Sequence, residues 1–236
     1  MTILILAAAV FLGIHLLIAG TPVRDGIVGA IGENAYLGLF SLLSLGVIAW
    51  LVIAYNAAQA SGDDPVLYAT GVGVQHLGMP IVLLAFLIGV PGLMMANPTA
   101  VMMSKTATKS DAVRGILRVT RHPFLWGVVI WSAFHLAANG DEASVILFGT
   151  FFLLALLGTY SIDAKRRRKL GADWQGFAAK TSNVPFAAII AGRNRFEPRE
   201  YFDWRFIAAI AIFTIALVSH AHVIGVSPFP NGWRPF

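Results

Sequence analysis

Three histidines lie inside long apolar stretches of the chain, where ionisable side chains are uncommon. His15, His76 and His135 each have only uncharged residues within four positions on either side. Such residues within a membrane span usually face the interior of the helix bundle and are functional candidates. For each one, the structural alternative is a neutral imidazole that hydrogen-bonds a neighbouring helix. Three together favour a b-type haem, which needs two axial nitrogens and an apolar slot.

The preferred axial metal ligands among these are His15 and His135. At 1.5 Å rise per residue, His15 lies about 8 Å and His135 about 18 Å from the inner end of its apolar stretch, a mismatch that helix tilt would have to absorb. His76, four residues before Pro80, is therefore the substitute ligand. Trp131 lies one helical turn before His135 on the same face and would line the porphyrin, although an aromatic residue at this spacing is more often ordinary packing.

A second candidate cluster is the Arg-His-Pro sequence that precedes the fourth apolar stretch. Pro123 at a first helical position is pre-organised for a helix start, so Arg121 and His122 could simply anchor the helix to lipid phosphates. His122 and His135 are 13 residues apart in sequence, which is about 20 Å along a helix, so they cannot share one small site. We expect Arg121 and His122, together with Arg24, to hold haem propionates or another anion at the inner rim.

The elements that must hold these side chains are membrane-spanning helices. Of the 236 residues, 57% are hydrophobic and 12% are charged, whereas about 25% are charged in an average soluble domain. A helix that spans a bilayer needs about 20 apolar residues. Six stretches approach this length: 3–20, 36–54, 66–90, 124–138, 143–160 and 204–223. We therefore predict an all-α integral membrane protein, a bundle of about six transmembrane helices that forms one domain over residues 1–236.

The basic residues alternate with the acidic ones between these stretches. Segments 20–35, 91–123 and 161–205 hold sixteen of the seventeen Lys and Arg residues, whereas segments 57–65 and 139–142 hold none. Because cytoplasmic loops carry an excess of Lys and Arg, we place both termini outside the cytoplasm. The two long basic segments, 91–123 and 161–205, are then cytoplasmic loops, and we expect each to carry short interfacial helices.

Composition also limits the partners and cofactors. The net charge of +5 lies along one membrane face, which favours anionic lipid as a partner over nucleic acid. The chain has no cysteine, and this excludes disulfides, iron–sulfur clusters, covalently attached c-type haem and thiolate ligation. No Lys or Arg precedes the first apolar stretch, so we expect that stretch to remain a helix rather than to be removed as a secretory signal.

Three segments resemble the NnrU family, which includes the plastid 15-cis-zeta-carotene isomerases. They are HLLIAGTPVR from His15, RHPFLWGVVIWSAFHLAANGD from Arg121, and DAKRRRKLGADWQGFAAKTSNVPF from Asp163. The resemblance implies a multi-span membrane protein, with haem b in the isomerase branch on positions that match His15 and His135. It also implies a bacterial branch linked to denitrification and nitric oxide metabolism. Ser132 stands where the isomerase branch would have a thiol ligand, so a redox-dependent ligand exchange is not expected.

On this resemblance we expect a bacterial inner membrane protein with an isomerase-like or nitric-oxide-related redox role. An apolar polyene or nitric oxide would be its partner. Ferrous haem with one displaceable ligand could donate an electron to a conjugated polyene and lower the order of its double bonds, and the same iron could bind nitric oxide. The residues do not decide between the two.

Two alternatives remain open. The chain is also similar, more distantly, to membrane isoprenylcysteine and phospholipid methyltransferases, which implies S-adenosylmethionine at the cytoplasmic face. The matching positions would be Arg121, His122, Asp163, Trp174 and Pro185. The other alternative is a non-catalytic assembly factor for a respiratory complex, whose basic loops dock a partner protein.

Overall fold

The computed structural model of the chain describes residues 1–100, 103, 106–107 and 112–229, and this part of the chain contains helices but no strand. The longer helices are α1 (Thr2–Gly13), continued by a π-helix η1 (Ile14–Ala19), α3 (Glu33–Ala60), α5 (Gly78–Leu93), α7 (Pro123–Ala138), α8 (Glu142–Leu170) and α12 (Trp204–Ile224). The shorter ones are α2 (Pro22–Ile31), α4 (Val72–His76), α6 (Ile116–Val119), α9 (Ala172–Lys180), α10 (Ala187–Ile190) and α11 (Pro198–Tyr201).

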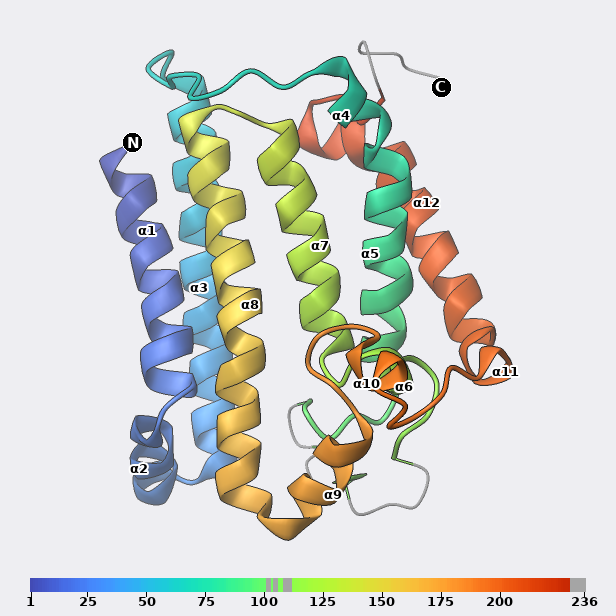
Figure 1. The fold of residues 1–236 in the computed structure, drawn as a ribbon. Helices are drawn as coiled ribbons and strands as arrows, with labels where there is room; N and C mark the ends of the chain where they lie inside the picture. Colours follow the sequence, from blue (N-terminus) through green and yellow to red (C-terminus); the bar gives the residue numbers. More distant parts are fainter. Residues whose placement is uncertain (101–102, 104–105, 108–111, 230–236) are drawn as a thin grey trace.

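Four of these helices are long and apolar enough to cross a membrane: α1 with η1, α3, α8 and α12. The shorter α5 and α7 are apolar but have 16 residues each. All six run alongside one another between the same two ends of the bundle (Figure 1). The prediction of a helical membrane protein is therefore confirmed, and four of the six predicted spans are matched by helices of sufficient length.

The third predicted span differs most from its expected form. Its first residues are not helical, α4 covers only Val72–His76, and the chain turns at Leu77 before α5 begins. Glycines at 71, 73 and 78 lower helix propensity here. Pro80 is the third residue of α5, where its missing N–H is tolerated because the first N–H groups of a helix have no intrahelical acceptor.

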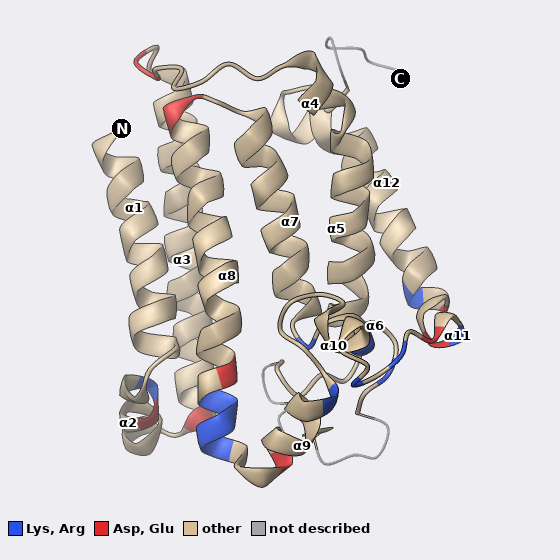
Figure 2. Ribbon diagram, viewed as in Figure 1, with Lys and Arg blue, Asp and Glu red and all other residues tan. Residues whose placement is uncertain are grey.

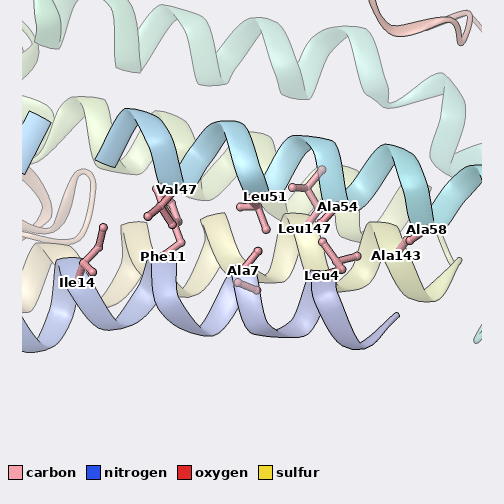
Figure 3. Packing of buried hydrophobic residues seen from close by; sticks show 11 residues of the cluster. Leu4, Ala7, Phe11, Ile14, Val47, Leu51, Ala54, Ala58, Ala143 and Leu147 are labelled. Atoms are coloured by element: carbon pink, nitrogen blue, oxygen red, sulfur yellow. The ribbon is translucent and has the colours of Figure 1, made fainter. Parts of the chain in front are cut away.

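One hydrophobic core joins α1, α3 and α8. Buried residues of α1 and η1 face those of α3, and two residues of α8 close the cluster (Figure 3); the labelled residues are Leu4, Ala7, Phe11, Ile14, Val47, Leu51, Ala54, Ala58, Ala143 and Leu147. Alanines in this cluster let the helices approach closely, as is usual for helix packing in membranes. Large apolar side chains such as those of Leu42 and Ile53 point outward and are exposed, which suits a lipid environment.

The second group of helices comprises α5, α7 and α12, with α7 packed against both α5 and α8. Glycines set the distance between α5 and α7. A Cβ atom on Gly127 would lie 2.8 Å from the Ala85 carbonyl oxygen and 2.8 Å from the Gly89 Cα atom. Because both neighbours are backbone atoms, only glycine fits at this crossing.

The two ends of the bundle differ in charge. Lys and Arg gather at the end that carries α2, α6, α9, α10 and α11, which we call the basic end (Figure 2). The short helices α6, α9, α10 and α11 lie in the two segments for which interfacial helices were predicted. At the opposite, acidic end, Asp141 caps α8 by accepting from the Ser144 N–H at 2.8 Å, and Asp64 accepts from the Ala143 N–H at 3.0 Å.

Candidate functional site

The three histidines share one hydrogen-bonding pattern. The Nδ1 atoms of His15, His76 and His135 each lie 2.8 Å from the backbone carbonyl oxygen four residues earlier. Because a carbonyl oxygen only accepts, Nδ1 must carry the proton, and the neutral ring then presents its lone pair on Nε2. This is the tautomer that a metal-binding histidine with a backbone partner adopts.

The Nε2 atoms of the three rings have different surroundings. In η1, the His15 Nε2 lies 3.2 Å from the Ser44 hydroxyl of α3, so this ring bridges two helices. No hydrogen bond to the His135 Nε2 is found among the described residues, and that ring packs against Trp131, Phe134 and Phe148 with centroid distances of 4.8, 5.5 and 4.7 Å. Single turns of π-helix often occur at functional sites, which keeps His15 a candidate.

His76 was predicted inside the span formed by the apolar stretch 66–90, but the structure places it elsewhere. It is exposed at the end of the short helix α4, at the acidic end of the bundle. The prediction of its depth was wrong because the residues before α4 do not continue the helix.

The structure does not bring His15 and His135 together. Phe11 contacts the His15 ring at 4.6 Å and Phe151 at 5.9 Å, and Phe151 contacts Trp131 at 5.8 Å. His15 lies one turn from Phe11 toward the basic end, and His135 lies one turn from Trp131 toward the acidic end. The rings of Phe11, Phe151 and Trp131 therefore stand between the two histidines, and no contact between the His15 and His135 rings is found among the described residues.

Two imidazoles that ligate one metal lie closer to each other than two rings with other side chains between them. With metal–nitrogen distances of about 2 Å, axial nitrogens are about 4 Å apart. The pair as placed does not fit an iron between them. Within the described ranges, no group of three or more His, Asp or Glu side chains could hold a metal ion either. Of the preferred pair, His135 is the one that could serve as a single ligand, since its Nδ1–H is held by a backbone carbonyl and its Nε2 accepts no hydrogen bond from the described residues, whereas the His15 Nε2 meets Ser44.

An apolar groove reaches Trp131, one helical turn from His135. It has a volume of about 290 Å³ and lies between α5 and α7, and its lining includes Ala85, Phe86, Gly89, Phe124, Val128 and Trp131. Trp131 is common to the groove and to the aromatic cluster, because its ring also contacts Phe148 at 5.4 Å. The predicted site residues Trp131 and His135 are thus in contact, with Trp131 between the imidazole and the groove.

A polar cluster lies at the start of α7, at the basic end. The Arg121 Nε donates to the two Asp163 carboxylate oxygens at 2.9 and 3.0 Å, and a second guanidinium nitrogen also bonds this carboxylate. The His122 Nε2 lies 2.7 Å from Asp163 Oδ1. The Arg121 guanidinium also lies over the Trp174 ring, 5.8 Å from its centroid. Arg121 and His122 are thus adjacent as predicted, but their donors are held by a carboxylate of this chain.

His122 is buried, with 1% of its surface exposed, and its Nδ1 atom has no hydrogen-bond partner among the residues that the structure describes. Burial lowers the pKa of this imidazole, and the nearby Arg121 and Arg166 charges lower it further, while Asp163 opposes the shift. Protonation would place an N–H in the interior without an acceptor, so the ring is neutral. It donates through Nε2 to Asp163.

Asp163 was predicted as a site residue only through the methyltransferase resemblance. Its position in the sequence could have indicated that it is buried. The buried residues of the inner half of α8 recur at helical spacing, and they are Ala155, Thr159, Asp163 and Arg166. The acidic residue thus belongs to the stripe that faces the bundle.

Arg24 lies apart from this cluster, on α2. Its guanidinium donates to Glu33 at 2.9 Å and stands over the Tyr36 ring, 5.1 Å from the centroid. Arg24 therefore stabilises the turn between α2 and α3, and the structure does not bring it together with Arg121 and His122.

Comparison with known proteins gives one family and two relatives. The family model described as NnrU protein matches residues 3–228. The chain is 28% identical over 117 residues to the chloroplastic 15-cis-zeta-carotene isomerase of Arabidopsis thaliana, covering 48% of this chain and 32% of the relative. It is 30% identical over 109 residues to the protein of the same name from Zea mays, covering 45% and 30%. The match thus spans about a third of the length of each relative, and no solved structure matches the chain.

Proposed function

The chain belongs to the NnrU family, and on this premise we propose that it is an isomerase-like membrane protein that binds an elongated apolar polyene in the groove between α5 and α7. The family relationship to zeta-carotene isomerases supports an isomerase-like role. The observation that carries the proposal is the contact of Trp131 with both the groove and His135.

The apolar lining of the groove suits a hydrocarbon ligand rather than a polar or charged one. The side chains and glycines that line it are apolar, and its volume of about 290 Å³ is at the lower end of the range for small-molecule sites. It would hold part of a long polyene, with the remainder along the lipid-facing surface. The Trp131 indole would orient the conjugated segment by packing against its plane, and the surrounding apolar side chains would exclude water.

His135 is the residue of this chain best placed to carry a cofactor. Its Nδ1–H is fixed by the Trp131 carbonyl at 2.8 Å, so the imidazole is held in one tautomer with Nε2 available. We propose that His135 would hold the iron of haem b, in place of the pair with His15. The haem would supply an electron that is lent to the conjugated polyene, where it lowers the double-bond order, and that returns to the iron after rotation, so that no net oxidation or reduction occurs.

The haem proposal has a sharp spectroscopic test. The reduced-minus-oxidised visible spectrum of the purified protein, expressed with haem precursor, should show a stoichiometric b-type band. His135→Ala should lose the band and His15→Ala should keep it. Loss in both variants would restore the paired ligation that the sequence suggested, and a blank spectrum of the unmodified protein would remove haem from the proposal.

The isomerase proposal is tested separately, with 15-cis-zeta-carotene in proteoliposomes and chromatography of the isomers. Val128→Phe fills the groove and should lower conversion about tenfold, the equivalent of about 1.4 kcal/mol of binding. Leu42→Phe, which adds a ring to an exposed position on α3, is the matched control and should convert normally. An unchanged isomer ratio with the unmodified protein, both reduced and oxidised, would reject the proposal.

We also propose that all six long helices span the membrane, which is the bacterial inner membrane. With 16 residues each, α5 and α7 would extend about 24 Å, so the bilayer would thin by a few ångström around them. The concentration of Lys and Arg at one end supports placing that end in the cytoplasm and both termini outside. A cysteine accessibility scan would test this, since a residue introduced at position 168 should be labelled only from the cytoplasmic side.

A second candidate function is S-adenosylmethionine-dependent methyl transfer. The observation in its favour is that Arg121, His122, Asp163 and Trp174 meet at the basic end. Against it, the Asp163 carboxylate already accepts hydrogen bonds from both Arg121 and His122. Equilibrium binding of radiolabelled S-adenosylmethionine decides this, because the methyltransferase reading requires saturable binding that Trp174→Ala weakens and His135→Ala does not.

A further inference from the structure

A polar pocket at the basic end is separate from the apolar groove and from the Asp163 cluster. It has a volume of about 240 Å³ and lies among the end of α5, α6, α11 and the start of α12. The residues of its lining that matter here are Arg114, Gly115, Arg199, Glu200, Asp203 and Arg205. Three arginines and two carboxylates therefore face one small space.

Both carboxylates of this pocket are already bound. Glu200 accepts from the Gly115 N–H at 2.8 Å and from the Arg118 Nε and Nη2 at 2.8 and 2.9 Å. These hydrogen bonds, the Arg118 bonds first, lower the pKa of Glu200, so its carboxylate is ionised at neutral pH. Asp203 is paired with Arg205, and it also caps α12 by accepting from the Arg205 N–H at 2.8 Å.

These ion pairs do not use every guanidinium donor of the pocket. The Arg199 side chain is exposed and makes no hydrogen bond or ion pair within the part of the chain that the structure describes. Arg205 is anchored by its Nε, which donates to the Met94 carbonyl oxygen at 3.2 Å. An anion such as phosphate would suit this space, because Arg199 can offer two parallel hydrogen bonds and Arg205 retains Nη2, its Nε and Nη1 being used by Met94 and Asp203.

The surroundings place this pocket at the depth of lipid head groups. Phe202 and Trp204 flank it and are 58% and 59% exposed, and amphipathic aromatic rings gather at the membrane interface. Arg205 stacks over the Trp204 ring, 5.0 Å from its centroid. Beyond Trp204, α12 continues with exposed apolar side chains such as Ile207, so lipid tails would lie along the helix that starts at the pocket.

We propose that this pocket binds the phosphate group of an anionic membrane lipid, with Arg199 and Arg205 as its donors. The volume of 240 Å³ is about eight times that of a water molecule in the liquid, enough for a phosphate with a small head group. The bound lipid would link α6 and α11 to the start of α12, in addition to the hydrogen bonds of Glu200 with Gly115 and Arg118 that already join α11 to α6.

The test compares thermal unfolding of the full chain in nanodiscs of phosphatidylcholine alone and of phosphatidylcholine with phosphatidylglycerol. The unmodified protein and Arg168→Gln should gain stability in the anionic discs, and Arg199→Gln should lose at least half of that gain. Arg168 is the matched control because it is an exposed arginine of the basic end, on α8. An equal gain in the two variants, or no gain in the unmodified protein, would overturn the proposal.

Two further measurements identify the source of the phosphate. Native mass spectrometry from mixed micelles should show a phosphatidylglycerol adduct on the unmodified protein that Arg199→Gln retains several-fold less. Inorganic phosphate in detergent should not reproduce the stabilisation. If it does so fully, the pocket takes soluble phosphate and the lipid assignment is wrong. Neither result depends on the isomerase proposal, because these arginines do not contact the groove.

Discussion

Removal of the Asp163 carboxylate is the perturbation whose cost the structure defines best. The side chains of Asp163 and Arg121 are 12% and 13% exposed, and that of His122 is fully buried. Asp163→Ala would leave a buried guanidinium without its counter-charge and a buried imidazole N–H without an acceptor. Breaking a buried ion pair by removing one partner costs about 3–5 kcal/mol, so we expect the free energy of unfolding to fall by about that amount.

The assay is reversible unfolding in mixed micelles, followed by circular dichroism. Asp173→Ala is the control, because Asp173 is an exposed carboxylate on the adjacent helix α9, and such surface changes usually stay within about 0.5 kcal/mol. The double variant Arg121→Gln/Asp163→Asn should lose less than the sum of its two single variants, by about 0.5–3 kcal/mol. If Asp163→Ala unfolds like Asp173→Ala, or if the double variant is additive, the cluster is not an energetic unit and this reasoning is refuted.

Three further predictions concern His122, Gly127 and Ser44. Burial holds the pKa of folded His122 below its usual 6.5, so the unfolded chain binds more protons than the folded chain below that pH. The free energy of unfolding should therefore be unaffected by this group above about pH 6.5 and should fall on acidification, by at most about 1.4 kcal/mol per pH unit. His122→Phe should remove this slope in unfolding titrations and His76→Gln should keep it. The Cβ atom of Gly127→Ala would meet backbone atoms at 2.8 Å, so this variant should be less stable by about 1–3 kcal/mol in the same unfolding assay. Gly149→Ala is the control and should keep its stability, because a Cβ atom there meets nothing within 4 Å. Equal effects of the two substitutions would mean that α5 and α7 are not in close contact. Ser44→Ala removes the hydrogen bond to His15 and should cost about 0.6 kcal/mol, the average for a bond between membrane helices, and a much larger loss would indicate that His15 has a role beyond bridging two helices.

The sequence predicted the helices well because their signals are local. Pro123 was placed at the start of a helix, and α7 begins there. The stretch 143–160 was recognised as apolar, and α8 covers it but continues to Leu170 through the basic residues. Apolar length and Lys and Arg positions can be counted without knowledge of any partner helix. The same local reasoning failed at His76, since glycine-rich residues that look apolar did not form a continuous helix.

The candidate site was predicted only in part. His135 and Trp131 are one turn apart on one helix, so their contact follows from helical periodicity alone. The distance between His15 and His135 depends on how α1 and α7 are offset along the membrane normal, and side-chain packing sets that offset. The space between the two imidazole rings is occupied by Phe11, Phe151 and Trp131. The sequence spacing of these three residues does not predict that they meet there.

By itself, the sequence determined that this is a helical membrane protein with one basic end, because hydrophobicity and charge act on each segment separately. The tertiary structure alone decided which side chains meet. Arg121, which lies just before α7, and Asp163 on α8 are 42 positions apart, and the groove lies where Gly127 of α7 meets Gly89 of α5. Such contacts arise from the fit of whole helices, and no single segment encodes that fit.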